Sequence, residues 1–425
     1  MKKLIFLLSL GMLGLTSAQT GPTIRCNYDE KWKEFTTQHP EAKVKHEQML
    51  EHNKNPNNIS PLVKKAVVTI PVVVHVLYKN PSQNITDAQI QSQLRILNED
   101  FRKLNADFNS VVPAAFKPFA ADMEIAFCLA TKDPSGATTT GVVRKSVASN
   151  FNFDNNYFNS AQGGDNAWDT TKYLNIWVGA FTNQDLLGWA YPPAAAGYGN
   201  DGLCITLYAF GDTGTVFNTP FGPNWPYTKG RTGTHEIGHY FGLNHIWGSS
   251  NNATVCGTAA NNDGAADTPA TNKPYFGVPI YPNNLNTCTT TPNGAMFMNY
   301  MDYCDDVTLA MFTADQKTIA QNALSNQRAG LLNSNACSLL SVDDVEKRGA
   351  INIFPSIATD FVSIASPVQK INEVEIFSAD GRLVKRVNIK NETDKIDISS
   401  FSSGTYYVRV YDKSEFIKSL KFIKK

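Results

Sequence analysis

The sequence has no excess of charge of either sign and few long apolar runs. Its 38 lysines and arginines balance 38 aspartates and glutamates, so the formal net charge is zero. Such a balance does not favour a nucleic acid or an anionic membrane surface as a partner. The first apolar run, residues 4–15, is too short to cross a bilayer, and no later run is long and apolar enough. We therefore expect no nucleic-acid partner and no stable membrane insertion.

Residues 1–18 have the pattern of a secretory signal peptide. Lys2 and Lys3 precede the apolar run, and Thr-Ser-Ala at residues 16–18 supplies small side chains at the expected cleavage position. A short transmembrane anchor is the alternative. Export through the general secretory pathway permits disulfide bonds. The chain of 425 residues is also too long for one domain.

Histidine is scarce, yet three of the seven histidines fall in one segment, THEIGHYFGLNHIWG at residues 234–248. Residues four apart share a helical face, so His235 and His239 can bind one metal. Gly242 permits a sharp turn that returns His245 as a third ligand. Glu236 is placed to act on a water at the metal rather than to bind the metal. Three imidazoles with an open fourth position are typical of catalytic zinc.

This HExxHxxGxxH motif and the segment NYMDY at residues 299–303 resemble the pappalysin family of metzincin endopeptidases, over about residues 67–332. The resemblance implies an α+β catalytic domain over residues 66–337, with a mixed twisted sheet, an antiparallel edge strand, a zinc helix and a loop-rich C-terminal subdomain. It also implies that Met301 lies beneath the zinc and that Tyr303 stabilises the transition state. Ordinary core packing is the alternative for both residues.

Residues 19–65 are polar with little apolar periodicity, which predicts a poorly packed prosegment. In many secreted metzincins a prosegment thiolate occupies the fourth zinc position, and Cys26 is the candidate here. Six other cysteines remain, which can pair fully in fifteen ways. Alternatively, Cys26 pairs with one of them and another is free. Lys64-Lys65 is a candidate activation cleavage site.

Periodicity predicts the main elements of the catalytic domain. The β-branched run at residues 67–78 predicts a strand buried on both faces, with His75 as a packed core histidine. By the resemblance, a short strand at residues 202–208 is the edge strand that binds the substrate backbone. The other expected elements are strands at residues 123–130 and 173–180, helices beginning at Thr86 and Thr313, and a surface loop at residues 145–170.

The segment after His245 resembles the calcium loop of the family. Asp263, Asp267 and Thr268 offer the oxygen ligands that calcium prefers; a simple Asx-rich turn is the alternative. A loop of this length favours a disulfide staple, for which Cys256 and Cys288 are the candidates.

Some pappalysins prefer a basic residue after the cut bond, through an acidic side chain just past the methionine turn. Counting from Met301 places this position at Val307, which cannot pair with Arg or Lys. We therefore expect a weak or absent basic preference, and acceptance of medium apolar side chains. If the segment shifts, Asp306 takes the role instead.

Residues 338–350 read as a polar linker, and residues 351–425 predict a small β-sandwich with short alternating strands and a hairpin at Asp380-Gly381. The segment GTYYVRV at residues 404–410 and the lysine-rich end resemble the C-terminal sorting domain of type IX secretion cargo. A carbohydrate-binding or adhesive module is the alternative.

The sequence thus predicts a secreted or cell-surface zinc endopeptidase that cuts extended polypeptides and crosses the outer membrane through the type IX machinery. Glu236 would accept the proton of the attacking water. The competing hypothesis is a secreted surface-binding or adhesive protein with a non-catalytic zinc site.

Overall fold

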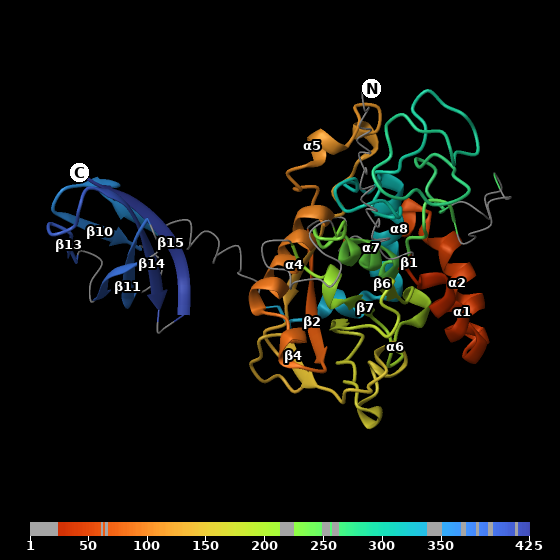
Figure 1. Ribbon diagram of the computed structural model, residues 1–425, viewed down its shortest axis with the longest axis horizontal. Coiled ribbons are helices and arrows are strands. Elements are labelled where there is room, and N and C mark those ends of the chain that lie inside the picture. Colours follow the sequence, from red (N-terminus) through yellow and green to blue (C-terminus); the bar gives the residue numbers. More distant parts are fainter. Residues whose placement is uncertain are drawn as a thin grey trace, which may run out of the picture. The chain divides into compact units, whose positions relative to one another are not determined.

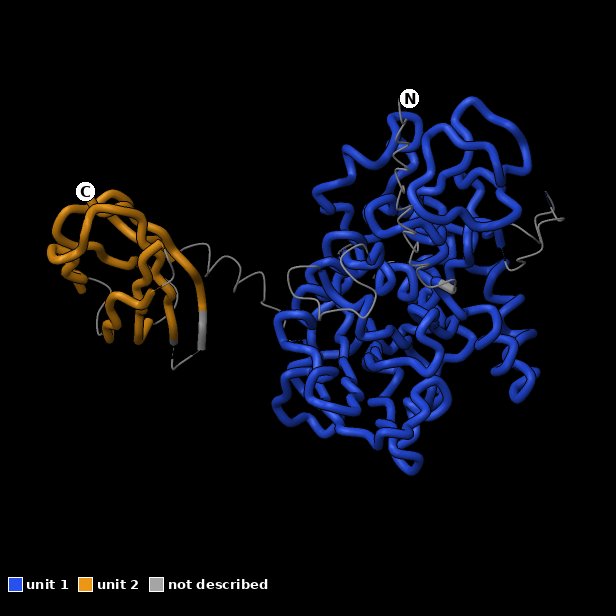
Figure 2. Tube along the Cα trace, viewed as in Figure 1, with its two compact units in different colours: residues 1–337 blue, residues 338–425 orange. Residues whose placement is uncertain are grey.

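A computed structural model describes residues 24–60, 63, 67–212, 225–248, 256, 263–337, 351–366, 371–379, 382–389, 394–412 and 415–425. The chain forms two compact units, Met1–Cys337 and Ser338–Lys425 (Figure 2), and each is described by itself. The expected signal peptide, the Lys64-Lys65 site and the linker at residues 338–350 lie outside the described residues.

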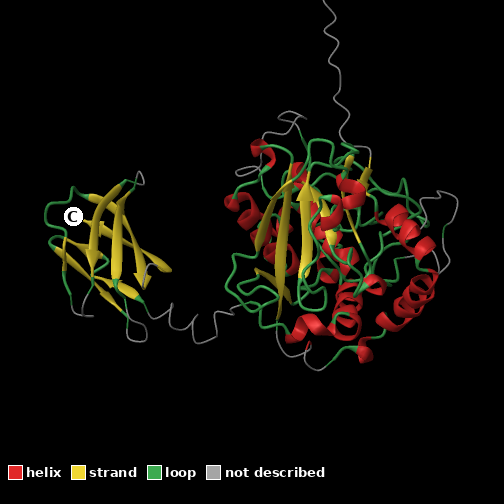
Figure 3. Ribbon diagram, turned by 90° about the horizontal axis from the view of Figure 1, so that it is seen from below, coloured by secondary structure: helices red, strands yellow, loops and turns green. Residues whose placement is uncertain are grey.

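The first unit is built on a seven-stranded sheet with the strand order β1-β6-β7-β5-β2-β3, and β4 pairs with the far half of β2. Neighbouring strands are parallel except β6 and β7, which are antiparallel. Figures 1 and 3 show this sheet with helices around it. The strands are β1 Ile24–Cys26, β2 Val68–Tyr78, β3 Ile125–Leu129, β4 Val142–Ser146, β5 Leu174–Gly179, β6 Leu186–Ala190 and β7 Leu203–Thr206.

Strand β2 lies inside the sheet and is buried on both faces at residues 70–77, as its β-branched run predicts. His75 is fully buried in this strand. Its Nδ1 lies 2.6 Å from a carboxylate oxygen of Asp165 and its Nε2 lies 3.0 Å from the Asn175 side-chain oxygen. The prediction of a packed core histidine is confirmed.

Seven α-helices are found in the described part of the first unit. Helices α4 and α7 pack against each other and against the sheet. The hydroxyl of Thr86 accepts a hydrogen bond from the Gln89 backbone at the start of α4, and Thr313 and Gln316 form the expected capping box at the start of α8. The helices are α1 Tyr28–Gln38, α2 Pro40–Asn53, α4 Asp87–Phe101, α5 Phe108–Val111, α6 Phe153–Asn156, α7 Arg231–Tyr240 and α8 Ala314–Asn322.

The prediction of a surface loop at residues 145–170 is partly wrong. The segment contains α6, and Phe153 and Tyr157 are buried in an aromatic cluster with Trp177 and Trp189 on one face of the sheet. Phe153 and Tyr157 each bury a large area. The residues around them are mostly polar, so the composition of the segment predicts a surface loop.

The expected position of the edge strand is also wrong. Residues 202–208 contain β7, but β7 lies between β5 and β6. The antiparallel strand at this side of the sheet is β6, Leu186–Ala190, and β1 covers it in parallel orientation. All five residues of β6 are buried, so this strand shows no alternating pattern in the sequence.

Residues 24–60 are well packed, contrary to the expectation of a poorly packed segment. After β1 the chain forms α1 and α2, whose Phe35 and Ala42 are buried against the aromatic face of the sheet. The side chain of Asn322 in α8 donates hydrogen bonds to the backbone oxygens of Asn53 and Asn55. The segment is polar overall because only one side of each helix is buried.

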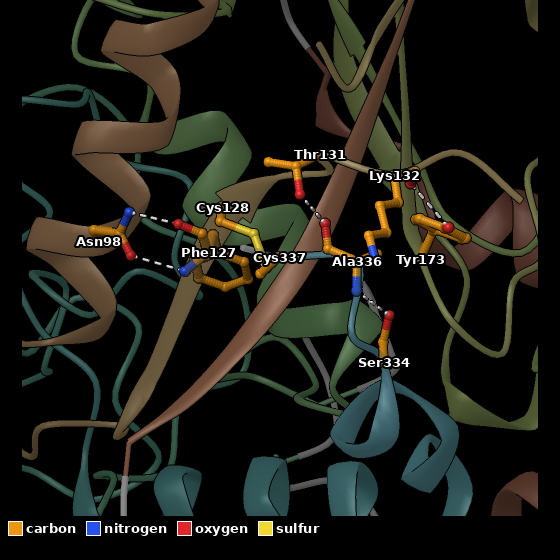
Figure 4. The surroundings of a disulfide bond; sticks show 9 residues. All are labelled: Asn98, Phe127, Cys128, Thr131, Lys132, Tyr173, Ser334, Ala336 and Cys337. Atoms are coloured by element: carbon orange, nitrogen blue, oxygen red, sulfur yellow. Dashed lines mark hydrogen bonds between the residues drawn. A yellow bond between two sulfur atoms is a disulfide. The ribbon is translucent and has the colours of Figure 1, made fainter. Parts of the chain in front are cut away.

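All seven cysteines lie in the described residues, and they do not pair fully. The Cys256–Cys288 bridge is present, and a second bridge joins Cys128 in β3 to Cys337, the last residue of the first unit (Figure 4). Cys26, Cys204 and Cys304 are unpaired and buried. Neither of the two alternatives is therefore found: the six other cysteines do not pair fully, and Cys26 pairs with none of them.

The second unit is a β-sandwich, as its short alternating strands predict. Two sheets, β13-β10-β8 and β12-β11-β14-β15-β9, enclose one apolar core. The Asp380-Gly381 turn lies outside the described residues, but the strands on either side of it, β11 and β12, are antiparallel neighbours. The strands are β8 Asn352–Phe354, β9 Ile357–Ala358, β10 Phe361–Ala365, β11 Glu373–Ser378, β12 Leu383–Asn388, β13 Ile396–Asp397, β14 Gly404–Asp412 and β15 Glu415–Lys424.

Candidate metal centre

Helix α7 and the turn that follows it carry the three histidines of the motif. The helix ends at Tyr240, and Gly242 has a φ of +87°, a conformation that side chains rarely adopt. The Gly242 N–H donates to the His239 carbonyl, and the Leu243 N–H donates to the Gly238 carbonyl. This glycine turn reverses the chain and places His245 opposite the helix.

The ligand atoms of the three histidines converge. The Nε2 of His239 lies 3.2 Å from the Nε2 of His235 and 3.1 Å from the Nε2 of His245. Two nitrogens bound to one zinc at about 2.0–2.1 Å in tetrahedral geometry are separated by roughly this distance. All three side chains are buried.

Hydrogen bonds fix the tautomer of two of these histidines. The Nδ1 of His235 lies 2.7 Å from the Tyr300 carbonyl, and the Nδ1 of His239 lies 2.7 Å from the Leu243 carbonyl. A carbonyl only accepts, so each Nδ1 carries the proton and each Nε2 keeps a free lone pair. Burial also lowers the pKa of both rings and so favours the neutral form that binds metals.

The thiol of Cys26 completes this cluster. Its sulfur lies within 4.8 Å of the ligand nitrogens of all three histidines, and no other such convergence of three or more metal-binding side chains occurs in the described residues. Strand pairing holds Cys26 there, because it lies opposite Gly188 of β6. The ring of Tyr28 stacks on the ring of His239, with centroids 4.1 Å apart.

Glu236 is fully buried beside the cluster. Its Oε2 accepts a hydrogen bond from the Cys26 thiol at 3.4 Å, and its Oε1 has no hydrogen-bond partner. Burial raises the pKa of Glu236 to about 8. The neighbouring Gly188 leaves room for this carboxylate, since a Cβ there would lie 3.0 Å from the Glu236 Cγ.

Met301 lies directly beneath helix α7. A Cβ added at Gly238 would lie 2.4 Å from the Met301 sulfur, so glycine is required there for the methionine to approach. The Met301 N–H donates to the Asn299 side chain, which exchanges two hydrogen bonds with Gln316 of α8. The methionine turn is thus fastened to the start of α8.

Tyr303 faces the cluster from the other side. Its hydroxyl lies 3.0 Å from the His245 Nε2 and donates to the Cys26 carbonyl at 3.2 Å. The ring is buried, and Phe276 lies beside it with ring centroids 5.9 Å apart. A hydroxyl in this position can donate to an oxygen that replaces the Cys26 carbonyl.

The donor set fits zinc on structural grounds. Three imidazoles and one thiol converge in a buried pocket, which matches the nitrogen and sulfur ligands that zinc prefers. An unpartnered buried carboxylate oxygen on Glu236 points to a further group at this place, such as a water.

The neighbouring residues Asp306 and Val307 differ in their exposure to solvent. Val307 is 48% exposed, whereas Asp306 is buried. One oxygen of Asp306 accepts from the Arg25 guanidinium at 2.8 Å, and the other accepts from the Lys229 N–H at 2.8 Å. Arg25 also donates to the Cys304 carbonyl at 2.6 Å. Sequence reasoning missed Arg25, although it directly precedes Cys26.

The calcium residues expected from the sequence lie together, and the Asp263 and Thr268 side chains bond to each other. Both oxygens of Asp263 accept from the Thr268 hydroxyl at 2.9 Å, and burial raises the pKa of Asp263 to about 8. Asp267 accepts from the Asp315 N–H through one oxygen, and its other oxygen has no hydrogen-bond partner.

Each of the two compact units contains a segment that matches a known protein family. Residues 159–325 match the family model described as Pregnancy-associated plasma protein-A, and residues 352–425 match the secretion system C-terminal sorting domain. An extracellular metalloprotease of Colletotrichum graminicola is 27% identical, covering 76% of this chain and 99% of that protein.

Two solved structures from Tannerella forsythia are also similar. A promirolysin mutant is 36% identical, with a TM-score of 0.62, covering 73% of this chain and 97% of that one. Mature mirolysin in complex with a cleaved peptide is 41% identical, with a TM-score of 0.56, covering 63% of this chain and 96% of that one.

The similarity to metalloproteases includes the helix and the turn that gather the three histidines, so this protein is a secreted zinc metalloendopeptidase of the metzincin class. More narrowly, the chain belongs to the pappalysin family. Its second unit is a sorting domain for type IX secretion, which directs export across the outer membrane. In the described residues no helix has both the length and the apolar character needed to cross a membrane.

Proposed function

We propose that Glu236 is the general base of peptide hydrolysis and that His235, His239 and His245 hold the zinc. Bound zinc would polarise the scissile carbonyl and lower the pKa of a water beside it. The Oε2 of Glu236 would take the proton of that water and then deliver it to the leaving amine. The observation that carries this proposal is the position of the buried, partly unpartnered Glu236 carboxylate next to three converging Nε2 atoms.

We further propose that residues 19–65 are a prosegment that keeps the enzyme latent. Cys26 lies where the fourth ligand of the metal belongs, Arg25 fills the site at Asp306, and Tyr28 covers His239. The thiol would bind zinc as thiolate. In support, the promirolysin structure covers a larger share of this chain than mature mirolysin does.

We propose that Asp306 binds the substrate side chain directly after the cut bond. In the buried Arg25–Asp306 pair an arginine side chain occupies this site, and both terminal nitrogens of its guanidinium donate hydrogen bonds. This reverses our expectation from the sequence, which placed Val307 in this role. Arg or Lys directly after the cut bond is therefore the favoured substrate feature.

Calcium at the loop of Asp263, Asp267 and Thr268 remains a proposal. Nearby carboxylates raise the pKa of Asp263 in addition to burial, and a bound cation would remove that unfavourable interaction. Backbone carbonyls would have to supply most of the remaining ligands. Calcium should raise the melting temperature of the mature enzyme, and the Asp267→Ala variant should lose this effect.

The decisive experiment compares the mature protein with its Glu236→Gln variant on a denatured protein substrate. Glutamine keeps the size of the side chain but cannot accept the proton, so zinc content should be retained and cleavage should fall to below a few per cent. A chelator should abolish the wild-type activity. Retained activity in the variant would contradict the role of Glu236, and a zinc-loaded but inactive wild type would favour a non-catalytic binding protein.

A further inference from the structure

An aromatic cluster lies where the N-terminal helices cover the end of β6. The ring of Phe35 in α1 lies 5.5 Å from the ring of Tyr191 and 5.0 Å from the ring of Tyr198, measured between centroids. His39 packs on Tyr198 at 4.6 Å, and the Tyr198 hydroxyl donates to Glu41. Tyr191 and Tyr198 belong to the catalytic domain, whereas their three partners belong to the proposed prosegment.

The direction of the chain at β1 shows which half of a substrate would reach this cluster. In the prosegment, Arg25 comes before Cys26, the residue at the metal centre. In a substrate, the residue bound by Asp306 comes after the cut bond. A substrate must therefore run opposite to β1, which makes it antiparallel to β6 because β1 and β6 are parallel. Its part before the cut bond then lies where residues 27 onward of the prosegment lie.

The distance along β6 gives the position within the substrate. Cys26 pairs with Gly188, and Tyr191 follows Gly188 by three residues. The Tyr191 N–H still bonds to the Gly202 carbonyl, so the extended ladder reaches this residue. At about 3.3 Å per residue, Tyr191 lies roughly 10 Å from the metal centre along the strand, which corresponds to about three substrate residues.

We propose that Tyr191 and Tyr198, once the prosegment has left, form a subsite for an aromatic or large aliphatic side chain about three residues before the cut bond. The proposal rests on the function proposed above, because the direction of the substrate depends on Asp306. Phe35, which is 6% exposed, shows the kind of side chain that this surface accepts. Removal of the prosegment would free the parts of both tyrosine rings that now contact Phe35, and such rings bind apolar and aromatic groups by burial and edge-to-face packing.

The test uses mature enzyme and two peptides that carry Arg after the cut bond and differ only at the third residue before it, Phe or Ser. Wild type should cut the Phe peptide with a kcat/KM about five- to tenfold higher, mainly through a lower KM, as expected for one aromatic contact. Tyr198→Ala should reduce this ratio to near one. Tyr198→Phe keeps the ring and should keep the ratio.

The outcomes separate the two proposals. If wild type cuts both peptides equally, or if Tyr198→Ala keeps the full preference, the subsite is wrong while the protease function stands. If wild type cuts neither peptide nor any Arg-containing protein, the proposed function itself fails. Equal zinc content and melting temperature in both variants show that a lost ratio is not caused by misfolding.

Discussion

The guanidinium of Arg25 lies 2.8 Å from the carboxylate of Asp306, and both side chains are almost completely buried, at 1% and 0% exposure. Tyr227 covers the pair, with its ring centroid 4.9 Å from the Arg25 guanidinium carbon. By the function proposed above, this buried ion pair between the N-terminal segment and the turn after the zinc site would link latency and specificity in one contact. An arginine of the substrate and Arg25 of the prosegment would use the same site.

The first prediction concerns specificity. Asp306→Ala removes the only side chain that pairs with Arg25 in the described residues, so the preference for Arg or Lys after the cut bond should be lost. A buried unpaired cation is costly, and cleavage before Arg should fall by at least about 100-fold. Sequencing the products of a proteome-derived peptide mixture measures this. Val307→Ala, an exposed neighbour, is the matched control and should leave the preference intact.

A second prediction tests latency. Cys26→Ala leaves the three histidines in place but removes the proposed fourth ligand, so the intact precursor should bind zinc and cleave a small peptide at a low but measurable rate, because Arg25 and Tyr28 still cover the cleft. The wild-type precursor should be inactive under the same conditions. To exclude self-processing as the cause, the precursor is checked for intactness after the assay. An active wild-type precursor with a bound prosegment would contradict the role of Cys26.

Tyr303→Phe should leave zinc content and folding unchanged but lower kcat by about 100-fold, with little change in KM. The hydroxyl lies beside the metal centre and would bind the oxygen that becomes negative in the transition state, an interaction that is weak in the ground state. Steady-state kinetics on one peptide suffice. A change confined to KM would assign Tyr303 to substrate binding instead.

The two compact units lead to a fourth prediction. A chain that ends at Cys337 keeps the complete core of the first unit and its Cys128–Cys337 bridge. After purification and removal of the prosegment it should cleave peptides at the rate of the full-length enzyme. In the native host it should stay inside the outer membrane, because the sorting unit is missing. Loss of activity in the purified protein would show that the second unit takes part in catalysis.

The sequence predicts the metal centre well because its ligands are local. His235, His239 and His245 lie within eleven residues, and the spacing alone defines one helix and one turn. Met301 requires only one more local motif. The central strand β2 and the C-terminal sandwich follow from periodicity for the same reason, whereas the α+β class was implied by the family resemblance.

The features that the sequence did not reveal depend on contacts between distant residues. Arg25 and Asp306 are 281 residues apart, and no local pattern marks an arginine as a pocket ligand. Six cysteines allow fifteen complete sets of pairings, and no local pattern marks the sets that contain the Cys128–Cys337 bridge. Strand β6 was missed because it is buried throughout, and the packing of residues 24–60 was missed because their apolar partners belong to another part of the chain.

The Cys128–Cys337 bridge provides a covalent path from the end of the first unit to strand β3. The C-terminal unit follows directly after Cys337, so a protein held at the cell surface by that unit is pulled at this point. The covalent bond passes the force to β3, which is hydrogen-bonded to β2 and further anchored by Asn98 of α4 (Figure 4). Tension therefore runs into the sheet and bypasses α8, whose Gln316 fastens the methionine turn. A pull on the sorting unit would thus reach β3 through the bridge before it reached the turn that carries Met301.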